Sequence, residues 1–136
     1  MSRKINLSEN HTRSLSSSLI VVEKSLLELE DMLLKKNDSC CNVIVKDNDD
    51  GTLANISTSI QEAKKCICVL AEKYGTSRQK LSLQRVINAK RTKIWEILTD
   101  MLSRKIKGYG AFPKKYTDEF DADINRLIEI TNKINY

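Results

Sequence analysis

The residues that could do chemistry in this chain are few. His11 is the single histidine among 136 residues, whereas Ser-His-Asp and Cys-His catalysis each place a histidine beside the nucleophile. A di-iron bundle needs two Glu-x-x-His motifs, which one histidine cannot supply. The Gly-x-Gly at residues 108–110 is too short to be specific for phosphate, and no complete nucleotide-binding glycine motif is present. We therefore expect a protein that is not an enzyme and binds no cofactor.

Four cysteines are the other candidate ligands, because together they could offer zinc four thiolates. Cys66 and Cys68 lie on a predicted helix, where residues two apart point in nearly opposite directions. Cys40 and Cys41 are adjacent and lack the usual two-residue spacer of a zinc site. We expect no metal site, and thiols that serve as small apolar filler with one of them exposed.

The N-terminal residues are polar after Met1-Ser2-Arg3-Lys4, and no apolar export signal follows them. Four cysteines without such a signal favour a cytoplasmic protein with reduced thiols. No apolar run approaches the roughly 18–20 residues that cross a bilayer, so we expect no membrane association.

The strongest signal is a charge asymmetry. Residues 76–115 hold 11 of the 23 Lys and Arg residues and two acids, a net charge of +9 against +5 for the whole chain. Such an asymmetry predicts an acidic partner. The candidate residues for contacting it are basic and aromatic. They are Arg78, Arg85, Lys93, Arg104, Lys107, Tyr109, Phe112, Lys114 and Lys115.

Nucleic acid is one partner that fits this set. On one long helix, the first five of these residues would share an outward arc of roughly 100°. Cations follow phosphates, and the aromatic residues at the end of the stretch can stack on unpaired bases. Glu96 and Asp100 lie in the same arc, however, so a solvated face of mixed charge stays open as the simpler interpretation. No base-reading motif is present.

Heptad spacing predicts the helices that must position these residues. Leucine and valine at positions 15, 19, 22, 26, 29 and 33 mark a first helix that ends near Lys36. A second begins near Thr52, and Gly75 closes it. Its apolar seam is Leu53, Ile56, Ile60, Ala63, Ile67, Leu70 and Tyr74.

A third helix is expected from a capping box at Thr76 to a stop at Gly108, and a fourth from Thr117, as its cap, nearly to Tyr136. The sequence thus predicts an all-α, antiparallel up-down four-helix bundle with a long third helix. Its connections should be short except for residues 37–51. We expect one domain, 1–136, with a loose N-terminal arm at 1–11.

Two packing details follow from this bundle. Residues 43–45 form a short apolar run, which we expect to cover Leu102 and Ile106 where the third helix overhangs the second. Arg91 falls on the apolar face of the third helix, midway along its length, and we expect it at the margin of the bundle interior. A buried guanidinium needs a carboxylate, so we expect a buried polar pair between Arg91 and Glu62 or Glu30.

Apolar residues beyond these seams suggest an interface. Ile20, Leu27 and Leu34 form a second column on the first helix, and Trp95 lies near an apolar edge. Ordinary lateral core is the competing interpretation of both features.

The sequence as a whole predicts a non-catalytic interaction or accessory protein that presents residues 76–115 to an acidic protein partner and forms homo-oligomers. The alternative is a sequence-nonspecific protein that binds RNA or DNA.

Overall fold

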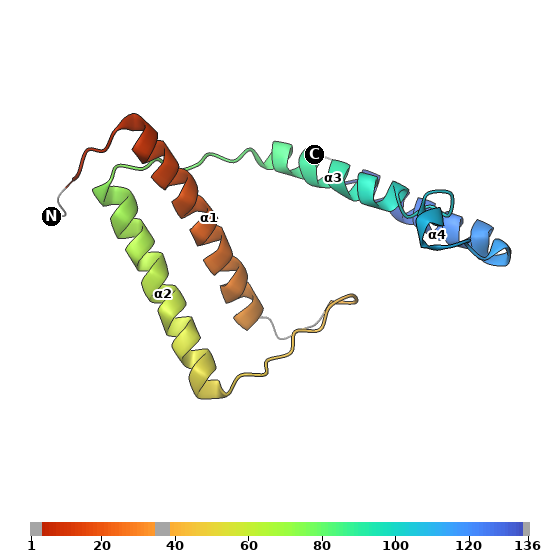
Figure 1. Cartoon of the computed structure of the whole chain (residues 1–136), viewed down its shortest axis with the longest axis horizontal. Helices are drawn as coiled ribbons and strands as arrows, with labels where there is room; N and C mark the ends of the chain where they lie inside the picture. The colour runs from red at the N-terminus through yellow and green to blue at the C-terminus, as the bar shows by residue number, and fades with distance from the viewer. Residues whose placement is uncertain (1–3, 35–38, 135–136) are drawn as a thin grey trace. The chain divides into compact units, whose positions relative to one another are not determined.

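The computed structural model describes residues 4–34 and 39–134 (Figure 1). It contains four α-helices and two short 3-10 helices, and the described residues include no strand. The predicted all-α class with four helices is confirmed. The elements are α1 (Glu9–Leu34), α2 (Asp50–Lys73), α3 (Leu83–Thr99), η1 (Ile106–Tyr109), η2 (Lys114–Tyr116) and α4 (Thr117–Asn132).

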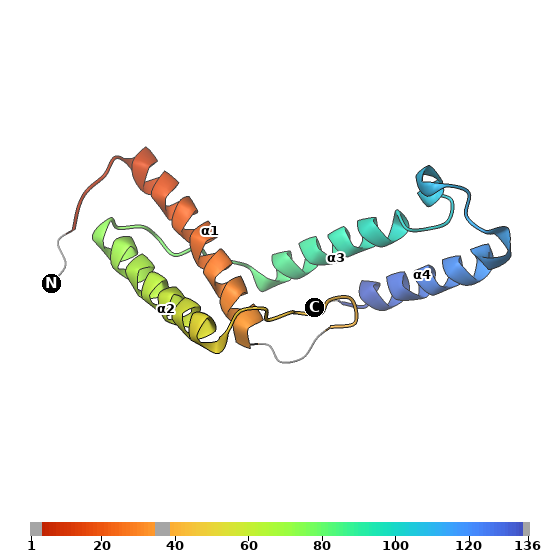
Figure 2. The same ribbon diagram turned by 60° about the horizontal axis from the view of Figure 1, so that its bottom comes forward.

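The chain divides into two compact units, Met1–Gln79 and Lys80–Tyr136. In the first unit α1 packs against α2, and in the second α3 packs against α4. Both pairs run antiparallel, as the colour gradient along the helices shows (Figure 2). Each unit is therefore an αα-hairpin. That the whole chain forms a single domain stays a prediction.

The seam predicted for α2 is confirmed residue by residue. All seven of its residues are at least partly buried, and Ile60 at its centre is the most buried hydrophobic residue of the unit. The seam of α1 is confirmed in part, because Val22 and Leu29 are exposed while the other four positions are partly buried. A helix with one neighbour buries a narrower stripe than its apolar residues could fill.

Side chains at the helix ends account for where the first hairpin begins and ends. The backbone N–H of His11 donates to Ser8 Oγ at 3.2 Å, so Ser8 caps α1, and that helix starts within the segment expected to be a loose arm. Ile5 in the same segment donates its backbone N–H to the carbonyl of Lys73 at 2.8 Å. Asp49 caps α2 by accepting from the N–H of Thr52 at 2.7 Å.

The third helix starts later than predicted because Thr76 belongs to the end of α2. Gly75 has φ of +65°, and the N–H of Thr76 donates to the carbonyl of Ala71 at 3.0 Å. With the bond from Gly75 N–H to Glu72, this is a Schellman motif, which uses the backbone of Thr76 to close α2. The connection therefore runs from Tyr74 to Ser82. Ser82 caps α3 by accepting from Arg85 N–H at 3.3 Å.

The third helix also ends earlier than predicted. It spans 17 residues, against 26 for α1, so the prediction of a long third helix is wrong. An α-helix continued through Ser103 would bond its N–H to the carbonyl of Thr99, but that N–H donates to Asp121 Oδ1 at 2.9 Å instead. The connection to α4 is correspondingly long and contains both 3-10 helices.

The fourth helix begins at Thr117 as predicted, but Thr117 does not cap it. The N-cap residue is Tyr116, whose side chain makes no capping hydrogen bond. The Thr117 hydroxyl donates to the carbonyl of Pro113 at 3.3 Å. In this second unit the buried hydrophobic residues are Leu102 and Ile128.

Candidate partner interface

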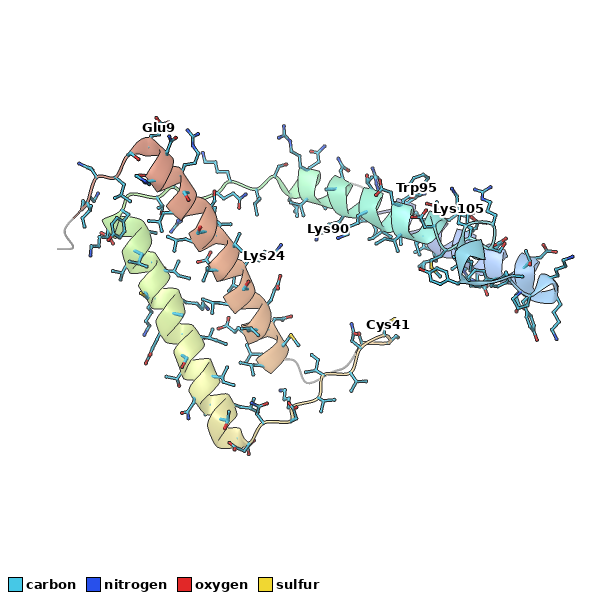
Figure 3. All side chains as sticks on the ribbon, viewed as in Figure 1. Glu9, Lys24, Cys41, Lys90, Trp95 and Lys105 are labelled. Atoms are coloured by element: carbon cyan, nitrogen blue, oxygen red, sulfur yellow. The ribbon has the colours of Figure 1, made fainter. Side chains whose placement is uncertain are left out.

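The connection between α3 and α4 gathers most of the candidate residues. Residues 100–116, called the α3–α4 loop below, contain Arg104, Lys105, Lys114 and Lys115 as exposed cations. Lys105 is labelled in Figure 3, at the end of this hairpin where the loop lies. The side chain of Lys107 lies outside the described residues. The loop therefore concentrates positive charge on one end of the second unit.

Contacts to α4 hold the loop at both ends. Ser103 binds Asp121 near its start, and the Phe112 ring packs on Phe120 with 4.7 Å between centroids. Between these anchors lies a pocket of about 550 Å³. Its lining residues are Ser103, Arg104, Ala111, Phe112 and Thr117. The pocket brings Arg104 and Phe112 together, so an aromatic surface lies beside a guanidinium.

Two tyrosines of the loop face solvent. Tyr109 is 94% exposed, and Tyr116 is half exposed beneath Lys115, whose Nζ lies 4.9 Å from the ring centroid. An exposed tyrosine among cations offers a flat surface for stacking and a nearby charge for an anion. Such an arrangement suits a ligand that combines planar or apolar groups with negative charge.

The remaining candidates do not join this loop. Arg78 lies in the connection after α2 and belongs to the first unit. Arg85 and Lys93 lie on α3, about 80° apart around its axis. The prediction that Arg78, Arg85, Lys93, Arg104 and Lys107 share one helical arc is therefore wrong, since α3 covers only Leu83–Thr99.

The net charge of the chain resides in the second unit. Residues 80–136 hold 12 basic and seven acidic residues, a net charge of +5, whereas the first unit is neutral. The acids concentrate at the start of α4, with Asp118 and Glu119 in its first turn. Hydrogen bonds from Ser103, and then the charge of Arg104, hold the pKa of Asp121 below its usual value. Part of the loop's positive charge is thus compensated within the unit.

Arg91 is partly buried, as predicted. It donates to Asn88 Oδ1 at 3.5 Å and lines a small pocket of about 130 Å³ with Thr92, Trp95 and Asn132. Its pairing with a carboxylate of the first unit stays a prediction, as does the packing of residues 43–45 on Leu102 and Ile106. Glu62 is exposed.

Within its own hairpin, Glu30 is already engaged. It accepts hydrogen bonds from Gln61 and from Lys64, whose Nζ lies 3.2 Å from each carboxylate oxygen. The bond from Gln61 and then that from Lys64 lower the pKa of Glu30.

Ser103 and Asp121 are the residues of this region that sequence reasoning missed. The two lie 18 positions apart, and neither follows a local motif. Asp121 lies near the N-terminus of α4, where an acid is expected because it interacts favourably with the helix dipole. That position gives no indication that its carboxylate also accepts the N–H of Ser103 after α3.

All four cysteines are exposed and unbridged, so the expectation that one is exposed while the others fill apolar space is wrong. Cys41 lies in the connection between α1 and α2 (Figure 3). In the part of the chain that the structure describes, no three His, Cys, Asp or Glu side chains gather as a metal site. None of the described helices is both long and apolar enough to cross a lipid bilayer.

Comparison with protein-family models finds no match, and neither the curated proteins nor the solved structures yield one.

Proposed function

We propose that this chain is a non-catalytic interaction protein that offers its α3–α4 loop to an acidic protein partner and associates with itself through exposed apolar helix faces. Low burial is the observation that carries the proposal. In the described residues the buried hydrophobic side chains are Ile60, Leu102 and Ile128. A fully folded domain of this length has a larger core.

The exposed cations of the α3–α4 loop indicate that its partner is acidic. Arg104, Lys114 and Lys115 are exposed, and within the described residues they form no ion pair at 4.0 Å or less. Arg104 lines a pocket with Phe112 as its aromatic wall, and Lys114 and Lys115 belong to the same loop. This combination suits a peptide segment in which carboxylates flank an apolar side chain.

Binding to a fluorescein-labelled polyglutamate peptide tests this proposal. We expect anisotropy to report binding at low salt, and the triple variant Arg104→Glu, Lys114→Glu, Lys115→Glu to lose it. The matched control reverses Lys4, Lys24 and Lys65, three exposed cations of the first unit, and changes the net charge equally. No binding by the unmodified chain, or equal loss in both triple variants, would overturn the proposal.

Single-stranded nucleic acid is the second candidate, favoured by the exposure of Tyr109 among cations. A labelled oligonucleotide in the same assay separates the two. Binding of the oligonucleotide that requires Tyr109, with no binding of polyglutamate, would select the nucleic-acid function.

A further inference from the structure

The pocket of the α3–α4 loop has an aromatic wall that the fold holds in place. Phe112 packs on Phe120 of α4, with 4.7 Å between the ring centroids and 40° between the ring planes. Phe112 is only partly buried by this contact, and it also lines the pocket. The pocket volume of about 550 Å³ lies in the range of sites that hold small organic groups. An aromatic side chain therefore fits within it.

The hydroxyl groups of the pocket wall are already used within the chain. Ser103 donates its hydroxyl and its backbone N–H to Asp121, and Thr117 donates its hydroxyl to the carbonyl of Pro113. A hydroxyl has a single proton to donate, so neither side chain can donate to an anion without giving up its present partner. The carboxylate of Asp121 also repels an anion that approaches Ser103. The interior of the pocket therefore suits a neutral group.

Arg104 is the pocket residue whose donors are available. In the described part of the chain its guanidinium makes no hydrogen bond and no ion pair within 4.0 Å. A guanidinium can hold a carboxylate through two parallel hydrogen bonds, and it also interacts favourably with the face of an aromatic ring. Arg104 can thus bind an acid next to a ring that occupies the pocket.

We propose that the pocket binds one aromatic side chain of the acidic partner, and that Arg104 binds a carboxylate beside it. The inference rests on the proposed function and adds the chemical class of the anchoring residue. Phe112 favours an aromatic side chain over an aliphatic one of equal size, because the edge of one ring attracts the face of another. Lys114 and Lys115 of the same loop supply charge for further carboxylates. The partner segment is therefore an aromatic residue flanked by aspartate or glutamate.

Three labelled peptides test this inference with the full chain. Each carries four glutamates on either side of one central residue, which is phenylalanine, cyclohexylalanine or alanine. Cyclohexylalanine matches phenylalanine in size and apolar character but has no aromatic ring. In fluorescence anisotropy at low salt, we expect the phenylalanine peptide to bind about threefold to tenfold more tightly than the cyclohexylalanine peptide. The alanine peptide should bind most weakly, through charge alone.

Filling the pocket should remove this preference. Ala111 is exposed and lines the pocket, so Ala111→Trp adds a large side chain there without deleting a packed one. We expect it to reduce the affinity for the phenylalanine peptide to that for the alanine peptide, and to leave the alanine peptide unaffected. Ala89→Trp is the matched control, because Ala89 is also exposed but lies on α3 outside the loop. Circular dichroism should show equal helix content in both variants.

The possible outcomes separate this inference from the proposed function. Equal affinities for the phenylalanine and cyclohexylalanine peptides would overturn the inference and leave the acidic partner in place, as would a preference that survives Ala111→Trp. If no peptide binds at all, the proposed function fails together with it. Binding of a single-stranded oligonucleotide that is lost in Ala111→Trp but kept in Ala89→Trp would assign the pocket to a base and so exclude the aromatic side chain.

Discussion

Ser103 donates both its backbone N–H and its hydroxyl to the carboxylate of Asp121, at 2.9 and 2.6 Å. This pair joins the turn after α3 to the second turn of α4. The carboxylate accepts the backbone N–H of Ser103, which in a longer α3 would have donated to the carbonyl of Thr99. Ser103 is the buried polar residue of the unit, so its hydrogen bonds have no ready replacement by water. The pair therefore fixes where α3 ends and where the α3–α4 loop begins.

Removing the Ser103 hydroxyl should destabilise the second hairpin. We expect Ser103→Ala to lower the free energy of unfolding by about 1 kcal/mol, the usual net value of one hydrogen bond. Ser77→Ala is the control, since Ser77 is exposed and only its backbone carbonyl accepts a hydrogen bond, from Ser16. Urea denaturation followed by circular dichroism measures both. An unchanged midpoint for Ser103→Ala would show that the backbone N–H alone holds Asp121.

Acid should weaken the same pair. The pKa of Asp121 is lowered by the hydrogen bonds from Ser103, so the folded state favours the ionised carboxylate. Its contribution to stability is complete above the ordinary aspartate pKa of about 4 and is lost as the pH falls through the lower folded-state value. Thermal melts of the unmodified chain and of Asp121→Asn should therefore converge as the pH falls below about 4. Melting temperatures that differ by the same amount at neutral and acid pH would contradict this assignment.

The sequence predicts local periodicity well and long-range contacts poorly. All seven residues of the α2 seam are placed correctly, because an amphipathic helix repeats its pattern within a few residues. The start of α3 is misplaced because two local motifs compete for Thr76. The capping box with Gln79 and the Schellman motif with Gly75 are both complete in the sequence, and the structure uses the second.

In the candidate site, too, the local grouping of residues is predictable from the sequence and the long-range contact is not. Lysines and aromatic residues between 104 and 116 are recognisable as a group from composition alone. The meeting of Arg104 and Phe112 in one pocket depends on Asp121, which binds Ser103 from 18 residues away, just beyond the end of α3. No periodicity reports that contact, so the sequence instead suggests an uninterrupted helix with its cations in one arc.

Gly75 should tolerate substitution poorly. Its φ of +65° lies in the left-handed region, although nothing within 4 Å would meet an added Cβ. Gly75→Ala should lower the free energy of unfolding of the first hairpin by about 1–2 kcal/mol, the cost of that backbone conformation for an L-residue. Gly108→Ala is the matched control, because Gly108 has equal space and no positive φ. Similar urea midpoints for the two variants would show that the Schellman motif does not hold the end of α2.

If the α3–α4 loop binds single-stranded nucleic acid, phosphate contacts must supply most of the affinity, because no base-reading motif is present. The loop offers Arg104, Lys105, Lys114 and Lys115 as exposed, described cations. Each phosphate contact on a single strand contributes about 0.7 to the slope of log K against log salt, so four contacts give about −2.8. Arg104 also stabilises the Asp121 carboxylate, and its partial compensation should bring the measured slope closer to zero than that value.

Anisotropy of a labelled oligonucleotide at several salt concentrations measures this slope. Tyr109→Ala should weaken binding at every salt concentration without changing the slope, because it removes stacking and no charge. Lys114→Gln should reduce the magnitude of the slope by about 0.7. Arg85→Gln, on α3 outside the loop, is the matched control and should leave the slope unchanged. A slope that responds to Arg85 as strongly as to Lys114 would place the contact on α3 rather than on the loop.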